Sequence, residues 1–125
     1  MPSRELIERF IATVERGQFV EAMEQFYAPD ATAQENNEPP RVGLPALLAH
    51  ERKSLAMFPT TRGRCLSPVL IDGDRVVIHW RFEFDHPSGA VLGLEELAWQ
   101  TWRGDRLVSE RFFYDPKQMM LPSPR

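Results

Sequence analysis

Apolar residues recur every three or four positions in the first part of the chain, a spacing typical of amphipathic helices. One apolar stripe comprises Leu6, Ile7, Phe10, Ile11 and Val14. Ser3 can cap the start of this helix, and Gly17 stands where a helix commonly ends. A second stripe follows at once and comprises Phe19, Ala22, Met23, Phe26 and Tyr27. Pro29 is expected to end this second helix, because proline does not continue a helix.

A third helix is predicted after a short strand and a loop. Residues 30–35 are interpreted as the strand, and residues 36–42, with two Asn and two Pro, as the loop. Gly43 and Pro45 begin the third helix. Its predicted buried side carries Leu44, Leu47, Leu48, Leu55, Phe58 and also Glu51.

The second half of the chain predicts strands over residues 61–71, 75–86, 90–102 and 106–114. Apolar and polar residues alternate within 75–86, which places one set of side chains on the core face. This set comprises Val76, Ile78, Trp80, Phe82 and Phe84. The Asp72-Gly73 pair is a signal for a two-residue hairpin. The hairpin would pair Cys65 with Trp80, Ser67 with Ile78, Val69 with Val76 and Ile71 with Asp74.

The last hairpin allows two registers, and a shift of one residue moves every side chain to the other face of the sheet. A two-residue loop would place Trp99 opposite Glu110. A three-residue loop would place Ala98 opposite Glu110 and Glu96 opposite Phe112.

We favour the longer loop, because it keeps Phe112 and Tyr114 together on the inner face. It leaves Leu97 and Trp99 on the outer face, beside Val77. An exposed apolar patch on a small domain usually marks an interface. We therefore expect a homodimer through the outer face of the sheet, with two-fold symmetry.

Length and composition describe an ordinary globular chain. With 125 residues, we expect one domain over residues 1–115 and a proline-containing tail over 116–125. The net charge of −3 predicts no attraction to nucleic acid or to an anionic membrane surface. Cys65 is the only cysteine, so no intrachain disulfide is possible. No apolar run is long enough to span a membrane, and a cytoplasmic location is expected.

With this element order, the chain resembles the NTF2-like superfamily, in particular its SnoaL-like and ketosteroid-isomerase-like branch. The residues that carry the resemblance are Phe10–Gly17, Phe26–Thr32, Gly43 and Arg111–Asp115. The resemblance implies an α+β, cystatin-like cone in which three N-terminal helices pack on a curved antiparallel sheet. It also implies a pocket at the open end of the cone and a frequent dimer through the outer sheet face.

The isomerase branch uses a carboxylate base and two acidic hydrogen-bond donors. By this resemblance Glu35 stands at the base position, Phe10 at the tyrosine donor position and Ala98 at the second donor position. Neither Phe10 nor Ala98 can donate a hydrogen bond. Such donors supply several kcal/mol of transition-state stabilisation, so the resemblance disfavours efficient steroid isomerisation.

Carboxylates are the main candidates for chemistry. Four of them are expected to face the pocket: Glu35, Glu51, Glu96 and Glu110. Clustered and desolvated carboxylates repel one another, so at least one should have a raised pKa, which suits general acid–base catalysis. The alternative is that they lie at a wet rim or pair with Arg62, Arg64 or Arg111.

These residues lead to two hypotheses. In the first, the chain binds a small, largely apolar molecule and catalyses proton transfer in an isomerase, cyclase or dehydratase type of reaction. Glu35 would remove the proton, and Glu110 or Tyr114 would orient or protonate the substrate. The expected ligand-binding residues are Phe10, Glu51, Trp80, Phe82, Glu96, Ala98 and Phe112. In the second, the chain is a non-catalytic ligand-binding or protein-interaction module.

No cofactor and no metal are expected. The His50-Glu51 pair resembles the start of the zinc-protease helix motif, but the second histidine four residues later is missing. No glycine-rich phosphate loop and no basic nucleic-acid stripe is present. A small-molecule ligand and a second copy of the chain are therefore the expected partners.

Overall fold

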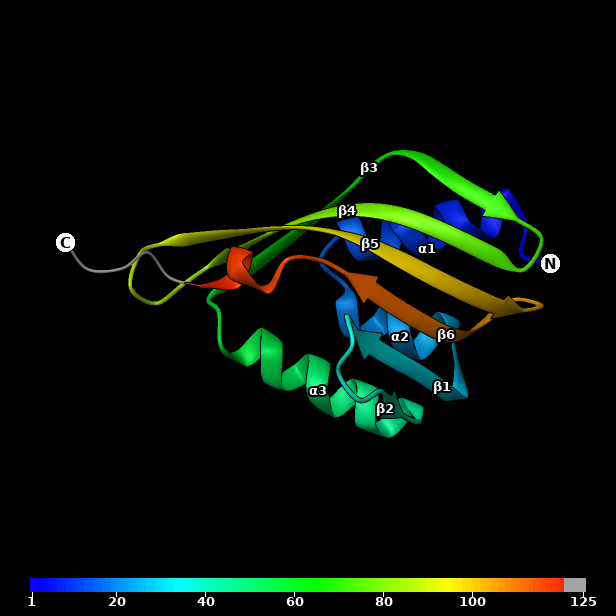
Figure 1. The fold of residues 1–125 in the computed structure, drawn as a ribbon, viewed down its shortest axis with the longest axis horizontal. Helices are drawn as coiled ribbons and strands as arrows, with labels where there is room; N and C mark the ends of the chain where they lie inside the picture. The colour runs from blue at the N-terminus through cyan, green and yellow to red at the C-terminus, as the bar shows by residue number, and fades with distance from the viewer. Residues whose placement is uncertain (121–125) are drawn as a thin grey trace.

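The computed structural model describes residues 1–120, which form three α-helices, six strands and a short 3-10 helix (Figure 1). The elements are α1 (Arg4–Glu15), α2 (Phe19–Phe26), β1 (Tyr27–Glu35), β2 (Arg41–Val42), α3 (Leu44–Ala56), β3 (Thr60–Asp72), β4 (Arg75–Asp85), β5 (Val91–Arg103), β6 (Arg106–Phe113) and η1 (Pro116–Met119). The strands form one sheet in the order β2-β1-β6-β5-β4-β3. The three helices pack on one face of this curved sheet, as predicted.

The sheet is mixed, and this corrects the prediction of a purely antiparallel one. Strand β1 runs parallel to β6, whereas every other neighbouring pair is antiparallel. The parallel pair arises because the chain returns to the middle of the sheet only after α3, β3, β4 and β5. As a result β1 and β6, which are far apart in the sequence, lie side by side and bring Ala33 opposite Glu110.

Helix α1 forms as the apolar spacing predicts. The side chain of Ser3 accepts a hydrogen bond from the backbone N–H of Leu6 at 3.0 Å and so caps the first turn. The chain leaves the helix through Gly17, whose φ of 81° suits a residue without a side chain. The buried face of α1 carries Phe10, which packs edge-on against Phe26 and Trp102.

Helix α2 is shorter than predicted. It ends at Phe26, and Tyr27 is the first residue of β1 rather than the last apolar residue of the helix. Pro29 therefore lies within the strand. The pairing of β1 with β6 is irregular between Tyr27 and Thr32, which is where a residue without an N–H is tolerated. This change turns the Tyr27 side chain toward β6.

The β3–β4 hairpin matches the prediction only far from its turn. Cys65 lies opposite Trp80 as predicted, but Ile71 pairs with Val76 and Asp72 pairs with Arg75. The predicted pairs Val69–Val76 and Ile71–Asp74 are therefore wrong, and the predicted pair Ser67–Ile78 falls in the irregular part of the hairpin. The register shifts between Leu66 and Leu70, a segment that contains Pro68 and so cannot continue the hydrogen-bond ladder.

The β5–β6 hairpin has the shorter loop and a bulge. Arg103 pairs with Arg106 across a two-residue turn, and the register then shifts by one residue between Thr101 and Trp102. Gln100 lies opposite Glu110, so none of the pairings predicted for Glu110 is correct. The extra residue at the bulge in β6 moves the side chains that follow it to the other face of the sheet. These side chains therefore lie on the inner face, as predicted with the longer loop.

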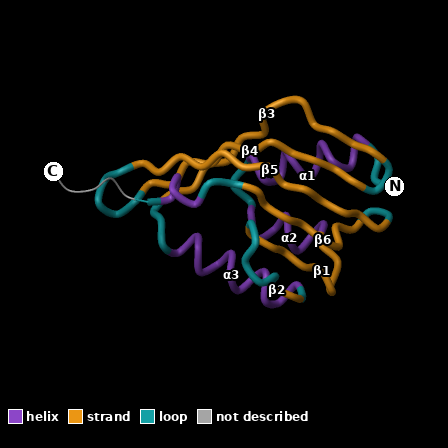
Figure 2. Tube along the Cα trace, viewed as in Figure 1, coloured by secondary structure: helices purple, strands orange, loops and turns teal. Residues whose placement is uncertain are grey.

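The core has two parts. The larger cluster lies between α1, α2 and the sheet, and the smaller one is formed by Phe84, Leu92 and Leu94 at the far ends of β4 and β5. The long strands β3, β4 and β5 extend to this second region, as the tube in Figure 2 shows. Helix α3 is buried only at Leu47, because its other predicted core residues are half-buried or belong to the smaller cluster.

The segment predicted as a tail begins with structure. In η1 the side chain of Gln118 accepts a hydrogen bond from the backbone of Glu95 and donates one back, at 2.8 and 3.0 Å. Residues 116–120 are thereby attached to β5, and residues 121–125 of the predicted tail lie outside the described residues. No helix within residues 1–120 is long and apolar enough to cross a membrane.

Candidate active site

A cavity of about 170 Å³ lies between the inner face of the sheet and the three helices. A cavity of this size accepts a ring-sized organic molecule. Its lining comes from α1, α2, α3 and all six strands. The side chains that line the cavity include Phe10, Phe19, Tyr27, Glu35, Arg41, His50, Glu51, Thr61, Trp80, Phe82, Phe84, Glu96, Glu110 and Phe112.

One wall of the cavity is aromatic. Trp80 and Phe82 have ring centroids 5.4 Å apart, Phe84 follows at 6.3 Å from Phe82, and Phe19 approaches from α2 at 6.2 Å. Gly63 lies opposite Phe82 on β3, and a side chain there would come within 2.6 Å of the Phe82 ring. The glycine therefore leaves room for this ring to lie against the strand. The wall offers flat apolar surface to a ligand.

The opposite wall is polar and comes from β1, β2 and α3. Glu35 accepts a hydrogen bond from Arg41 at 3.0 Å and another from the hydroxyl of Tyr114 at 3.1 Å. Burial, together with Glu35, raises the pKa of Tyr114 to about 12, so this hydroxyl keeps its proton. Burial raises the pKa of Glu51 and lowers that of His50 on the same wall.

Glu110 lies at the deep end of the cavity and is 3% exposed. The Tyr27 hydroxyl donates to its Oε1 atom, and the amide nitrogen of Gln100 donates to its Oε2 atom at 2.7 Å. Burial raises the pKa of Glu110 to about 7, against the opposing effect of these two donors. The carboxyl group is therefore held in one orientation and titrates near neutral pH.

Glu96 is 8% exposed and lies on the same inner face. Within residues 1–120 its carboxyl group makes no hydrogen bond and no ion pair, in contrast to Glu110. Burial raises its pKa to about 8, and the charge of Glu110 adds to this effect. At pH 7 the side chain is mainly a neutral carboxylic acid, which can donate a hydrogen bond into the cavity.

The structure brings most of the predicted site residues to this cavity. Glu35, Glu110 and the predicted ligand-binding residues Phe10, Glu51, Trp80, Phe82, Glu96 and Phe112 line it. Tyr114 reaches it only through Glu35, and Ala98 is fully buried beneath the lining. Arg62 and Arg111, considered as partners for the carboxylates, bind Asp85 and the Asn36-Asn37 turn instead.

Sequence reasoning missed Tyr27, Arg41, Gln100 and Trp102. Tyr27 was assigned to a helix stripe and Arg41 to a loop. Gln100 carried the one usable signal, because a polar residue in the inner stripe of β5 must find a partner when it is buried. The register of the last hairpin hid that partner, Glu110.

Two buried polar atoms of the lining have no partner among residues 1–120: Nε of Arg41 and the hydroxyl oxygen of Thr61. Such atoms are costly to bury unless something binds them. Within the same residues no group of three His, Cys, Asp or Glu side chains is arranged to hold a metal ion. The cavity therefore offers acid–base groups, an aromatic surface and unused polar atoms.

The family model for the SnoaL-like domain matches residues 7–110, which is most of the chain. The chain belongs to the SnoaL-like family. Among curated proteins none matches this SnoaL-like chain. Many solved structures share this fold.

A candidate SnoaL-like polyketide cyclase from a Jannaschia species is 16% identical, with a TM-score of 0.74 over 89% of this chain and 83% of its own. TerC, co-crystallised with polyporic acid, is 16% identical, with a TM-score of 0.78 over 92% of both chains. A Catenulispora acidiphila protein with a ketosteroid-isomerase-like fold, in complex with trimethylamine, is 15% identical, with a TM-score of 0.77 over 94% and 90%. These similarities establish the NTF2-like fold of the chain.

Proposed function

We propose that this SnoaL-like protein binds a small, largely apolar molecule in its cavity and catalyses proton transfer on it. The observation that carries the proposal is the pair of buried carboxyl groups, Glu96 and Glu110, in a cavity that also has an aromatic wall. Both titrate near neutral pH, where general acid–base catalysis is most effective. Two relatives crystallised with small molecules, polyporic acid and trimethylamine, support a small-molecule ligand.

The surroundings of the two carboxyl groups separate their roles. Glu110 has the lower pKa, and two donors stabilise its ionised form, so it acts as the base that removes a proton from a C–H group. Glu96 keeps its proton to higher pH and has no internal partner, so it donates to a carbonyl oxygen of the substrate. Proton removal at carbon and protonation at oxygen together convert a ketone into its enol.

We infer that the two groups would lie at opposite ends of one ligand. Gln100 lies opposite Glu110, and Glu96 is four residues further along β5, which corresponds to about 13 Å along the strand. Side chains from a concave sheet converge, and we infer a ligand of one or two rings between the carboxyl groups. Such rings would lie against Trp80 and Phe82.

This assignment replaces Glu35 as the predicted base. Glu35 forms an ion pair with Arg41 at 3.0 Å and accepts a hydrogen bond from Tyr114, whereas both donors to Glu110 are neutral side chains. We assign Glu35 and Arg41 to substrate orientation, with the unpartnered Nε of Arg41 and the hydroxyl of Thr61 as the polar atoms that a ligand would satisfy. Tyr114 then holds Glu35 in place.

A non-catalytic ligand-binding module is the second candidate. It is favoured by the resemblance to the isomerase branch, which implies that Phe10 and Ala98 occupy the two donor positions, although neither side chain carries a hydrogen-bond donor. In this case the raised pKa values would reflect burial alone. The two candidates share the cavity and differ in whether Glu96 and Glu110 act on the bound molecule.

A ligand screen by thermal shift, followed by turnover assays on each hit, separates the candidates. The enzyme proposal predicts that Glu96→Gln and Glu110→Gln reduce turnover at least about 100-fold while binding persists. Glu95→Gln is the matched control, because Glu95 is exposed on the opposite face of the same strand. Binding without turnover, unchanged by both substitutions, would favour the non-catalytic module.

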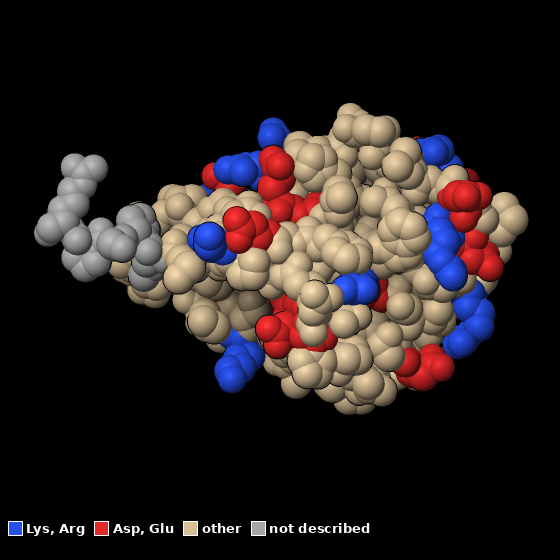
Figure 3. Space-filling model, in the orientation of Figure 1, with Lys and Arg blue, Asp and Glu red and all other residues tan. Residues whose placement is uncertain are grey.

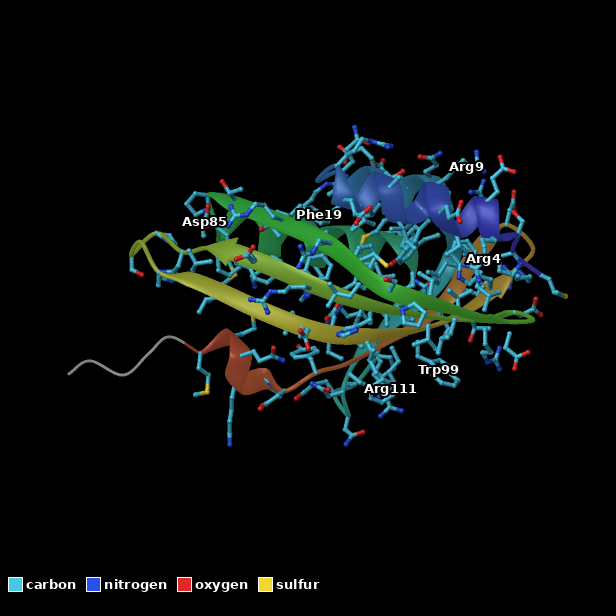
Figure 4. All side chains as sticks on the ribbon, turned by 90° about the horizontal axis from the view of Figure 1, so that it is seen from above. Arg4, Arg9, Phe19, Asp85, Trp99 and Arg111 are labelled. Carbon is cyan, nitrogen blue, oxygen red and sulfur yellow. The ribbon has the colours of Figure 1, made fainter. Side chains whose placement is uncertain are left out.

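We also propose a homodimer through the outer face of the sheet. Leu97, Trp99 and Phe113 are exposed there on β5 and β6. Figure 4 shows that Trp99 and Arg111 point away from α1, on the far side of the sheet. Figure 3, which looks onto this face, shows charged side chains mainly around its edge and a broad area of other residues at its centre. The arrangement is typical of an interface with an apolar centre and a polar rim.

Sedimentation tests the dimer. The wild-type protein is expected to sediment as a dimer at micromolar concentration, and Trp99→Glu as a monomer, because a charge would be buried at the centre of the interface. A wild-type protein that remains monomeric at 500 μM would contradict the proposal.

A further inference from the structure

A chain of four buried side chains joined by hydrogen bonds extends from the lining of the cavity into the core. The indole N–H of Trp102 donates to Oε1 of Gln100 at 2.9 Å, and Nε2 of Gln100 donates to Oε2 of Glu110 at 2.7 Å. The hydroxyl of Tyr27 completes the chain at Oε1 of Glu110. Gln100 is 0% exposed, so water cannot replace either of its partners.

The chemistry of the indole fixes the direction of this chain. A tryptophan N–H only donates, so the atom of Gln100 that faces it must be the amide oxygen. The amide nitrogen is then forced to the other end of the group, where it meets Glu110. Without Trp102 the amide would be free to turn and present its oxygen to Glu110, and two facing oxygens require a proton between them.

We propose that Trp102 and Gln100 are positioning residues that act through Glu110: Trp102 locks the amide of Gln100 so that its NH₂ group always faces the carboxylate. This orientation of the amide keeps Oε2 of Glu110 as a hydrogen-bond acceptor. A proton that Glu110 takes up then resides on Oε1, where the Tyr27 hydroxyl can rotate from donor to acceptor. This inference rests on the role proposed for Glu110 as the base.

Packing against α1 holds the side chains of Trp102 and Tyr27 in place. The ring of Phe10 meets Trp102 edge-on, with centroids 5.9 Å apart, and lies 6.3 Å from the ring of Tyr27. Phe10 thereby contacts both ends of the chain. The residue at the tyrosine position of the isomerase branch braces the groups that orient the carboxylate.

The other charged and titratable groups around Glu110 do not orient the amide of Gln100. Tyr27 faces it from β1, Glu51 from α3 and Glu96 from β5, and Glu35 lies further along β1. Glu51 raises the pKa of Glu110 through its charge, whereas the donors Tyr27 and Gln100 lower it. Gln100 is thus one of two side chains that favour the ionised form.

The titration midpoint of Glu110 tests the proposal in the ligand-free protein. Carbon-13 NMR of glutamate-labelled protein reports each carboxyl group, and the Glu110 signal is assigned by its loss in Glu110→Gln. Trp102→Phe keeps an aromatic ring but removes the N–H, and it is expected to raise the midpoint by about one pH unit. Trp99→Phe is the matched control on the opposite face of β5, and it should leave the midpoint unchanged.

A double-mutant cycle distinguishes positioning from general loosening of the core. Gln100→Met removes the donor to Glu110 and should raise the midpoint by a similar amount. Because Trp102 acts through Gln100, adding Trp102→Phe to Gln100→Met should produce no further shift. Additive shifts, or a Trp102→Phe midpoint equal to that of the wild type, would overturn the proposal.

The test remains decisive if Trp102→Phe does not fold, as judged by near-ultraviolet circular dichroism. The test then rests on Gln100→Met alone. An unchanged Glu110 midpoint in that variant would overturn the role proposed for the amide. The measurement needs no ligand and no turnover. A raised midpoint in a protein that proves inactive would retain the lock and reject the enzyme proposal, so the two failures can be told apart.

Discussion

Glu96 and Glu110 are both buried on the inner face of adjacent strands, yet their environments are opposite. Glu110 receives a hydrogen bond on each carboxyl oxygen, whereas Glu96 receives none within the described residues. Burial raises the pKa of both groups, and the hydrogen bonds explain why Glu110 is raised less, to about 7 rather than about 8. The comparison shows that hydrogen-bond donors, in addition to burial, set the pKa of a buried carboxyl group.

The strongest test of this comparison is the dependence of stability on pH. Both carboxyl groups have a higher pKa in the folded protein than the value of 4.5 for an exposed glutamate. Below about pH 4.5 both states are mainly protonated and burial carries no ionisation cost. The cost grows between pH 4.5 and the folded-state pKa values near 7 and 8, and it levels off above them. The free energy of unfolding should therefore fall from pH 5 to pH 9, with Glu96 alone contributing on the order of 4 kcal/mol.

Urea unfolding at a series of pH values checks this prediction. Glu96→Gln should reduce the slope of the profile between about pH 5 and 8, because glutamine stays neutral. Glu95→Gln, on the exposed face, should leave the profile unchanged. A wild-type protein that gains stability from pH 5 to 9 would show that the two carboxyl groups ionise normally.

Replacing each carboxyl group with leucine sharpens the contrast. At pH 6, Glu110→Leu should destabilise the fold by about 2 kcal/mol, because it leaves the Tyr27 hydroxyl and the Gln100 amide buried without an acceptor. Glu96→Leu should be neutral or stabilise the fold by about 1 kcal/mol, because no internal hydrogen bond is lost. Thermal unfolding of the two variants measures both values, and equal effects would remove the distinction.

A smaller effect is expected from Tyr27→Phe, which removes one of the two donors to Glu110. The Glu110 midpoint should rise by about one pH unit, toward that of Glu96. The Glu96 midpoint should hardly move, because Tyr27 does not bind it. A carboxyl-resolved NMR titration gives both values in one experiment, and a fall in the Glu110 midpoint would refute the assigned hydrogen bond.

The smallest predicted effect comes from Glu51→Gln on α3. The charge of Glu51 raises the pKa of both Glu96 and Glu110. Removing this charge should lower both midpoints by a few tenths of a pH unit, with Glu110 remaining below Glu96. A reversal of their order would mean that charge, and not hydrogen bonding, sets the difference.

The sequence predicted the faces of the sheet better than its pairings. The alternation of apolar and polar residues alone placed Trp80, Glu96 and Glu110 on the inner face, because successive side chains of a strand point to opposite faces of the sheet. The bulge in β6 and the break at Pro68 depend on local backbone geometry that periodicity does not record. The pairing of Gln100 with Glu110 was lost for this reason.

The candidate site was predicted in its acidic residues and missed in its donors. Carboxylates in an apolar stripe stand out, because charged groups are rarely buried without a reason. Tyr27 resembled the last apolar residue of a helix, and Arg41 lies in a segment that reads as a loop. Both acquire their roles only when the parallel pairing of β1 and β6 and the short strand β2 bring distant segments together.

The central claim is that Glu96 and Glu110 form an acid–base pair poised near neutral pH. A carbon-13 titration of the ligand-free, glutamate-labelled protein tests it most directly, with Glu96→Gln and Glu110→Gln assigning the two signals. The structure predicts midpoints near 8 for Glu96 and near 7 for Glu110, apart from the exposed glutamates. Midpoints close to 4.5 for both groups would contradict the claim.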